Sequence, residues 1–389
     1  MSANGSMKKM VQDMCAKRDR GERLLPIERI VLTVAHETQD RIPVGFLFTE
    51  WVVNRYGYTC SEAAADPEKH SDAIVKFFDE FDYDTLFPGI ETTVVEAEIL
   101  GCKLKRPVDS NPQIVEHAIK SEADVERLEE LVTADNLLER GRMPVRLELF
   151  RQLLKKTEGR YAIIATPMQP FPVAVQLLGV RLMSRWLMTR PLLVHRVVEA
   201  CTQACIRFAN AFKDVGTHGI TSIAAWNSVP YFSPEQLWEF DTPYLARMIQ
   251  SVAPLPFIHY YWGLRLLGDQ WERFLVHQMA TGTFLMTNLA PDADEGPSQD
   301  LKRFRELAQS YHKSYVVGMD AALMSDGTPE AIRNRVREYI GKLYPCDKGC
   351  MVVPNAIPAD SPVENVRAFI DAINEFGTFP LDKARLGVN

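Results

Sequence analysis

The segment FIHYYWG (257–263) places His259 at the end of an apolar run, with Tyr261 two residues further along the chain. An imidazole, a phenol or a carboxyl group can deliver a proton to a departing oxygen or nitrogen atom when its pKa suits the reaction. We therefore predict catalytic roles for His259, Tyr261 and Glu91, which follows an earlier apolar run. The structural alternatives are a buried histidine with satisfied hydrogen bonds, a core tyrosine and a solvated loop glutamate.

Polar and aromatic side chains also stand just past most of the other apolar runs. Amides at these positions could fix the polar groups of a small substrate, and rings could stack on a flat one. The structural alternative for each ring is that it only closes the top of the core. The predicted substrate-binding residues are Gln169, Trp226, Asn227, Phe232, Asn288, Asp320 and Asn355.

These candidates depend on eight short β-rich runs that alternate with longer amphipathic segments. The runs span residues 42–48, 84–88, 161–166, 219–225, 255–261, 283–288, 314–319 and 350–354. Several amphipathic segments open with Ser or Thr, then Pro, then Glu, which is typical of a helix N-terminus. Strand and helix repeated eight times predict a (β/α)8 TIM barrel of the α/β class. An open doubly wound sheet is less favoured, because no GxGxxG motif follows the first run.

Such a barrel would bring the candidates together, because the carboxyl ends of its strands meet at one end. Side chains two residues apart on a strand point the same way, which predicts that His259 and Tyr261 both face the interior. We expect a single barrel domain over residues 26–389, preceded by an N-terminal helical extension over residues 1–25.

The composition argues against several classes of partner. Hydrophobic residues make up 46% of the 389 residues, yet no apolar run approaches the ~18 residues that a membrane helix needs. The net charge is −7 with acidic and basic residues interspersed, so no basic surface for nucleic acid is expected. The polar N-terminus lacks the apolar core of a signal peptide, and seven scattered cysteines favour reduced thiols. Together these features predict a cytoplasmic protein.

Four segments resemble the uroporphyrinogen decarboxylase superfamily, and within it the branch of cobalamin-dependent methyltransferases. They are DRIPVGF (40–46), TTVVEAEILGCKL (92–104), GTPEAIRNRVREYI (327–340) and VPNAIPADSPVENVRAFIDA (353–372). The resemblance runs from about residue 26 to about residue 376. It implies a (β/α)8 barrel that works with a corrinoid carried on a separate protein.

The resemblance also implies where a metal or a porphyrinogen would bind. Thiol methyltransferases of this branch hold zinc with an HxC pair and a later cysteine, but the matching positions here are His259 with Tyr261, and Asn355 with Ala356. Two of three ligands are missing, so we expect no zinc, although Cys346 and Cys350 leave a rebuilt site open. The decarboxylases place an arginine-rich RQAGR element after the first strand, where this chain has GFLFTEW. Porphyrinogen decarboxylation is therefore not expected.

We predict a corrinoid-dependent methyltransferase that moves a methyl group between a small methylated substrate and a corrinoid protein. An aromatic methyl ether is the favoured donor, which would make the reaction an O-demethylation of anaerobic one-carbon metabolism, and a methylamine or methylthiol is the alternative. Reduced cobalt is already a strong nucleophile, so the protein would need to activate the leaving group. Two further alternatives are a decarboxylase or lyase acting on a non-porphyrin substrate, and a non-catalytic corrinoid-binding barrel.

Overall fold

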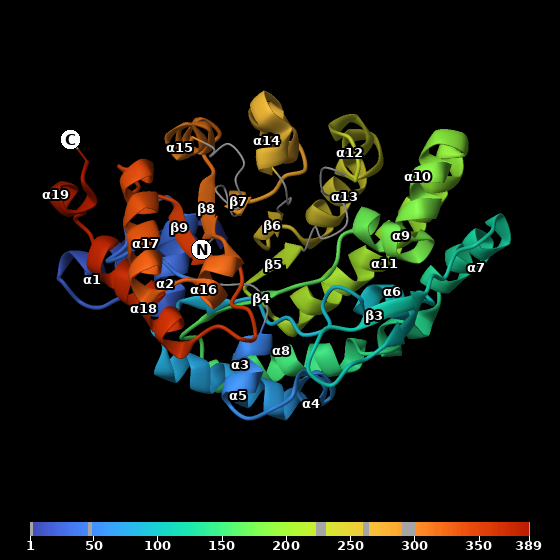
Figure 1. The fold of residues 1–389 in the computed structure, drawn as a ribbon, viewed down its shortest axis with the longest axis horizontal. Helices are drawn as coiled ribbons and strands as arrows, with labels where there is room; N and C mark the ends of the chain where they lie inside the picture. The colour runs from blue at the N-terminus through green and yellow to red at the C-terminus, as the bar shows by residue number, and fades with distance from the viewer. Residues whose placement is uncertain (1–2, 46–48, 223–230, 260–263, 290–299, 389) are drawn as a thin grey trace.

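Parallel strands surrounded by helices form the body of the molecule (Figure 1). The computed structural model describes residues 3–45, 49–222, 231–259, 264–289 and 300–388. Within these ranges, the parallel strands pair in chain order, four in one sheet and three in another. They are β1 (Thr85–Leu86), β4 (Ala162–Ala165), β5 (Gly219–Ser222), β6 (Phe257–His259), β7 (Leu285–Leu289), β8 (Ser314–Met319) and β9 (Cys350–Pro354). Each of these strands lies in a predicted run, except that β7 extends one residue beyond the run at 283–288.

The first predicted run lies beside β1. The carbonyl oxygen of Val44 accepts hydrogen bonds from the backbone N–H groups of Asp84 (2.9 Å) and Thr85 (3.2 Å). Residues 42–45 therefore occupy the position of the first barrel strand, although they are not paired as a regular strand. Residues 46–48 of this run lie outside the described ranges. The order of the runs around the barrel is the predicted one.

Helices follow the strands and cover the outside of the sheet. The N-terminal helix α1 (Ala3–Asp19) precedes α2 (Pro26–Val34), which leads into the first run. The others are α3 (Glu50–Arg55), α4 (Cys60–Ala65), α5 (Pro67–Glu80), α6 (Val95–Ile99), α7 (Glu122–Val132), α8 (Met143–Thr157), α9 (Pro170–Leu178), α10 (Val180–Thr189), α11 (Pro191–Val215), α12 (Pro234–Phe240), α13 (Thr242–Val252), α14 (Trp271–Met279), α15 (Leu301–Ser310), α16 (Ala321–Asp326), α17 (Pro329–Leu343), α18 (Val363–Phe376) and α19 (Lys383–Leu386). Two 3-10 helices, η1 (Asp135–Glu139) and η2 (Leu264–Gln270), complete the set. None of the described helices is long and apolar enough to cross a membrane.

The predicted helix starts have the expected capping chemistry. The hydroxyl of Thr328 accepts a hydrogen bond from the N–H of Ala331 at the start of α17, and Pro329 occupies the first turn. Ser233 caps α12 in the same way before Pro234. A short antiparallel hairpin, β2 (Lys103–Lys105) and β3 (Gln113–Glu116), was not predicted.

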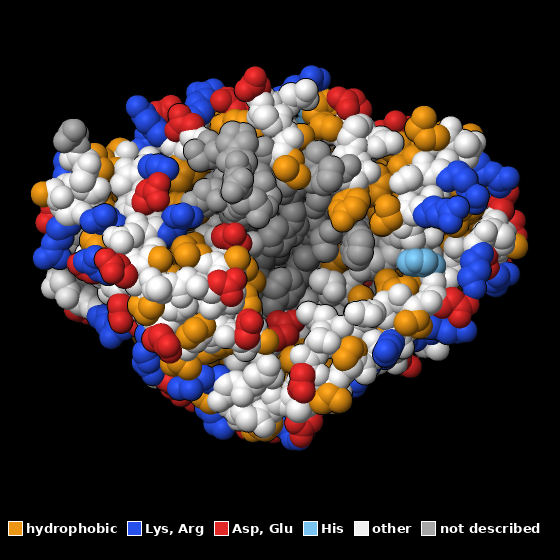
Figure 2. Space-filling view, viewed as in Figure 1, with side chains coloured by type: hydrophobic (Ala, Val, Ile, Leu, Met, Phe, Trp, Pro, Cys, Tyr) orange, Lys and Arg blue, Asp and Glu red, His pale blue; other side chains and the backbone are white. Residues whose placement is uncertain are grey.

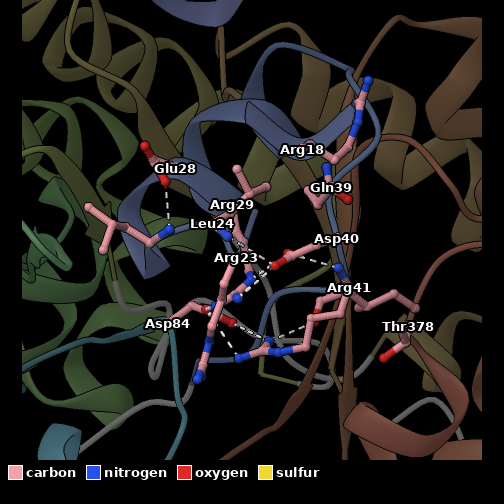
Figure 3. A network of polar contacts seen from close by, with 12 residues as sticks. Arg18, Arg23, Leu24, Glu28, Arg29, Gln39, Asp40, Arg41, Asp84 and Thr378 are labelled. Carbon is pink, nitrogen blue, oxygen red and sulfur yellow. Dashed lines mark hydrogen bonds and ion pairs between the residues drawn. The ribbon is translucent and has the colours of Figure 1, made fainter. Parts of the chain in front are cut away.

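A buried ionic network ties α2 to the amino ends of the first two barrel positions (Figure 3). Asp84 is fully buried and accepts from Arg29 (2.9 Å), from Arg41 (2.6 Å) and from the backbone N–H of Val44 (2.8 Å). Arg29 also forms two hydrogen bonds to Asp40, of 2.6 and 2.8 Å. Buried charges are tolerated when they are paired and hydrogen-bonded in this way. Asp40 and Arg41, the first two residues of the DRIPVGF segment, therefore help to stabilise the amino end of the barrel.

Candidate active site

The face of the molecule in Figure 2 is hollowed near its centre, and acidic side chains lie along the lower left edge of the hollow. In the same view of Figure 1, β5 and β6 lie near that centre. Three of the predicted site residues, Trp226, Asn227 and Tyr261, fall outside the described ranges. The described candidates are therefore considered by the strand end that each one follows.

The side-chain amide of Asn111 links Glu50 to the backbone of Glu91 near the carboxyl ends of the first two barrel positions. The side-chain NH2 of Asn111 donates to Glu50 Oε1 (2.8 Å), and its oxygen accepts from the backbone N–H of Glu91 (3.4 Å). The Glu50 side chain is half-buried, and the loss of solvation raises the pKa of its carboxyl group. Of Glu50 and Glu91, Glu50 is thus the residue whose carboxyl group has a raised pKa.

Sequence reasoning did not select Glu50 as a site residue. Glu50 is the first residue of α3, and its capping residue Thr49 is held from two sides. The Thr49 hydroxyl lies 2.8 Å from Nε2 of His70 and accepts from the N–H of Gly89 (3.4 Å). Burial lowers the pKa of His70 to about 3, so this histidine is neutral. In the sequence, only its position could have identified Glu50 as a site residue, because it is the first charged residue after the first run.

Glu91 is held in ion pairs. Its side chain is buried, and Nε of Arg106 donates to Oε1 (3.0 Å) while Nε of Arg142 lies 3.5 Å from Oε2. Its backbone φ of 59° is left-handed, which is uncommon for a residue other than glycine. The solvated loop glutamate considered above is therefore excluded. A catalytic role for Glu91 stays a prediction, because both of its oxygens already face arginine.

His259 ends β6 and is fully buried. The amide NH2 of Gln169 lies 2.9 Å from His259 Nδ1, so Nδ1 is the acceptor and the imidazole proton lies on Nε2. Burial lowers the pKa of His259 to about 3, which leaves the ring neutral near pH 7. Gln169 and His259, predicted as separate site residues, are therefore in direct contact.

That His259 faces the barrel interior stays a prediction. Its neighbour Ile258 lines a cavity inside the barrel together with Gly219 and Leu285 of the adjacent strands. Side chains alternate between the two faces of a regular strand, but His259 is the last residue of β6, and residues 260–263 lie outside the described ranges. The face that a strand turns to the interior depends on register, which no single run reveals.

A buried ion pair positions the loop that carries Gln169. Glu96 Oε1 accepts from Arg146 (3.1 Å) and from the backbone N–H of Met168 (3.2 Å). Arg146 also donates to the carbonyl oxygen of Thr166 (2.8 Å). Glu96 belongs to the TTVVEAEILGCKL segment, so that segment supports the β4 loop, and through it the Gln169 contact with His259.

The remaining predicted binding residues differ in whether their side chains already have partners within the protein. Asn288 in β7 and Asn355 after β9 are buried, and Asn288 Nδ2 and Asn355 Oδ1 have no hydrogen-bond partner among the described residues. Asp320 instead caps α16 by accepting from the N–H of Ala322 (3.2 Å). Phe232 packs edge-on against Phe171, with ring centroids 5.0 Å apart, and is buried in the core. The two asparagines are thus the better-placed ligands for a polar substrate.

Comparison with known proteins decides the family. A model described as uroporphyrinogen decarboxylase (URO-D) matches residues 25–376. The chain belongs to the uroporphyrinogen decarboxylase family. The resemblance stated from the four segments is therefore confirmed.

Relatives of this uroporphyrinogen decarboxylase family member include methyltransferases. A methylated-thiol–coenzyme M methyltransferase from Methanosarcina mazei is 27% identical over 292 residues, 72% of this chain and 70% of the relative. A methylcobamide:CoM methyltransferase from Methanosarcina barkeri is 20% identical over 234 residues, 59% of this chain and 68% of the relative. A solved methyltransferase structure from Methanosarcina mazei has a TM-score of 0.75 at 19% identity, covering 91% of this chain and 99% of that one. The family and this fold likeness confirm the predicted (β/α)8 barrel.

The described part of this family member offers no obvious zinc site. No group of three or more His, Cys, Asp or Glu side chains in the described ranges could hold a metal ion. Cys350 is the first residue of β9 and Cys346 precedes it, so both thiols lie near the amino end, away from His259 at the carboxyl end of β6. A hydrogen bond with the Cys350 thiol, together with burial, raises the pKa of Cys346. These two cysteines therefore do not rebuild the ligand set around His259.

Proposed function

We propose that this protein transfers a methyl group between a small methylated substrate and a corrinoid carried on a separate protein. Its family membership and the two curated methyltransferase relatives support this reaction class. An aromatic methyl ether is the proposed donor, with a methylamine or a methylthiol as the alternatives. The reduced corrinoid supplies the electron pair that accepts the methyl group.

The observation that carries the choice of an ether is the raised pKa of Glu50 at the carboxyl end of the first barrel position. When the methyl–oxygen bond of an aromatic ether breaks, the bonding electron pair stays on the oxygen. A carboxylic acid next to that oxygen can protonate it, which gives a phenol and a carboxylate that regains its proton from water. A carboxyl group can act in this way near neutral pH only if its pKa is raised, and the pKa of Glu50 is raised by burial.

His259 would assist this reaction as a neutral hydrogen-bond donor. Its pKa of about 3 excludes a substantial imidazolium population near pH 7, while Gln169 fixes the ring with Nε2 protonated. Asn288 and Asn355 would bind polar groups of the substrate with the atoms that have no partner in the described ranges. We thus assign proton donation to Glu50 and orientation to these three residues.

The test is an anaerobic assay with reduced corrinoid as the methyl acceptor. The purified protein is mixed with cob(I)alamin and with methoxylated aromatic compounds, methylamines or methylthiols, and the absorption change to methylcobalamin is followed. We expect methoxylated aromatic compounds to give the fastest change. A faster reaction with methylthiols would replace the proposed substrate class, and no change with any donor would refute the methyltransferase assignment.

A further inference from the structure

The barrel interior contains a cavity at the amino ends of the strands, opposite the candidate active site. Its volume is about 490 Å³. Large apolar side chains from the strands and from α2 form most of its wall, and Met7 and Met10 of α1 lie at its edge. Representative wall residues are Ile27, Ile30, Phe87, Ile164, Ile258 and Leu285.

Small side chains explain why this part of the barrel is not filled. Barrel interiors are normally packed by layers of bulky residues from alternate strands. Here Ala162 of β4, Gly219 of β5 and Ser314 of β8 contribute little volume to the wall. A Cβ atom at Gly219 would lie 3.0 Å from Cδ1 of Ile164, so the glycine also lets Ile164 occupy its place. The cavity therefore follows from the residues at these positions.

The hydroxyl groups in the wall are already satisfied by the protein. Thr85 donates to the carbonyl oxygen of Ala162 (2.7 Å), and Ser314 donates to that of Thr33 (2.8 Å). A cavity whose polar groups are internally paired holds water poorly and favours an apolar occupant. An engineered cavity of about 150 Å³ can hold benzene, so this volume has room for roughly a dozen or more carbon atoms.

One side of the cavity carries hydrogen-bond donors. Lys213 lines it, and its ammonium group donates to the carbonyl oxygen of Ala253 (3.0 Å), which uses one of three N–H groups. His218 also lines it and accepts from the N–H of Ile163 (3.0 Å) at Nδ1, so its proton lies on Nε2. Among the described lining residues, Lys213 carries the single formal charge, and no Asp or Glu is present.

We propose that this cavity binds a carboxylate with an unbranched apolar chain, such as a medium-chain fatty acid. The chain would fill the apolar interior, and the carboxylate would meet Lys213 and His218 at the edge. A buried cluster of Leu285, Val316, Met351 and Val353 fills the neighbouring interior of the barrel. The ligand would therefore enter from the amino face, and its binding does not depend on the proposed methyl transfer.

The experiment measures decanoate and decanol binding to the full-length protein by titration calorimetry. We expect one saturable decanoate site per chain. Lys213→Met retains an apolar side chain but removes the charge, and should weaken decanoate by about tenfold or more, the loss expected for a hydrogen bond to a charged group. Decanol binding should change by less than about twofold, and the exposed Lys302→Met on α15 should change neither ligand.

The location is tested separately with methionine methyl groups labelled with ¹³C. Decanoate should shift the NMR signals of Met10 and Met351, identified through Met10→Leu and Met351→Leu. Ala162→Leu should fill the cavity and abolish these shifts, with a thermal melt confirming that the variant folds. Absence of saturable decanoate binding, unchanged affinity in Lys213→Met, or shifts that leave both methionines unaffected would each overturn the proposal.

Discussion

At the level of single residues, the account depends on Glu50, whose carboxyl group has a raised pKa. Glu50→Gln keeps the size of the side chain but cannot donate a carboxylic proton. We predict that it slows the methyl-transfer step by roughly 10²- to 10⁴-fold, the usual contribution of a positioned general acid. Single-turnover kinetics with an aromatic ether and cob(I)alamin measure this rate.

The role of Glu50 also predicts how the methyl-transfer rate depends on pH. Because Glu50 must be protonated to act, the wild-type rate should fall as pH rises through its raised pKa. The Glu50→Gln rate should lack this fall. The exposed Glu330→Gln in α17 is the matched control and should behave like wild type. Equal rates for wild type and Glu50→Gln would remove Glu50 from the mechanism.

His259 supports a separate prediction about stability. Its folded pKa of about 3 lies below the ~6.5 of an unfolded histidine, so between these values the unfolded chain binds a proton that the folded chain does not. The resulting stabilisation is complete above about pH 6.5 and is lost as pH falls toward 3. In His259→Gln, the difference in unfolding free energy from wild type should shrink by about 1.4 kcal/mol per unit between pH 6 and pH 4.

Urea unfolding at several pH values measures this difference. His312→Asn is the control, because His312 is exposed and Asn tolerates its positive φ of 50°. Parallel curves for wild type and His259→Gln would show that the folded histidine titrates normally.

At the level of elements, the Glu96–Arg146 pair connects α6, α8 and the loop after β4. Glu96→Gln leaves the buried Arg146 without a matching charge, and we predict a loss of about 3–5 kcal/mol in the free energy of unfolding. Glu199→Gln breaks the exposed pair with Arg247 and should cost no more than about 1 kcal/mol. Chemical denaturation of both variants measures these losses in the free energy of unfolding. Equal losses in Glu96→Gln and Glu199→Gln would contradict the prediction.

Periodicity predicted these elements because strands and amphipathic helices carry their signal in local sequence. The helix starting at Pro329 and the strand at 350–354 were both found in this way. The β2–β3 hairpin was missed because its short strands are half exposed and lack a clear apolar pattern. Which face of β6 lies inside the barrel could not be derived from its run alone, because that face depends on pairing between distant segments.

The candidate site was less predictable than the fold for the same reason. The contact between Gln169 and His259 joins residues 90 positions apart, and the pKa of Glu50 depends on the segments that surround it. Type and position along the chain identified Gln169 and His259 as candidates. Solvation and hydrogen bonding, which distinguish an acid from a neutral donor, required the tertiary structure.

For the whole molecule, stability and the proposed chemistry depend on opposite ends of the barrel. The Asp84 network holds the amino end, whereas the proposed chemistry lies at the carboxyl end. Asp84→Asn should therefore destabilise the protein by about 3–5 kcal/mol, because Arg29 and Arg41 lose a buried charge partner. Its methyl-transfer rate per folded molecule should match wild type. A melt and an assay below the melting temperature check both parts, and a slow but fully stable variant would contradict this separation.

The most direct test of the central claim follows the methyl group itself. A methoxylated aromatic compound carrying a CD3 group is incubated with the protein and cob(I)alamin, and the corrinoid is analysed by mass spectrometry. The account predicts CD3-cobalamin and an equal amount of the free phenol, both formed much more slowly by Glu50→Gln. Unlabelled corrinoid in the presence of folded wild-type protein, or release of CO2 in place of methyl transfer, would contradict it.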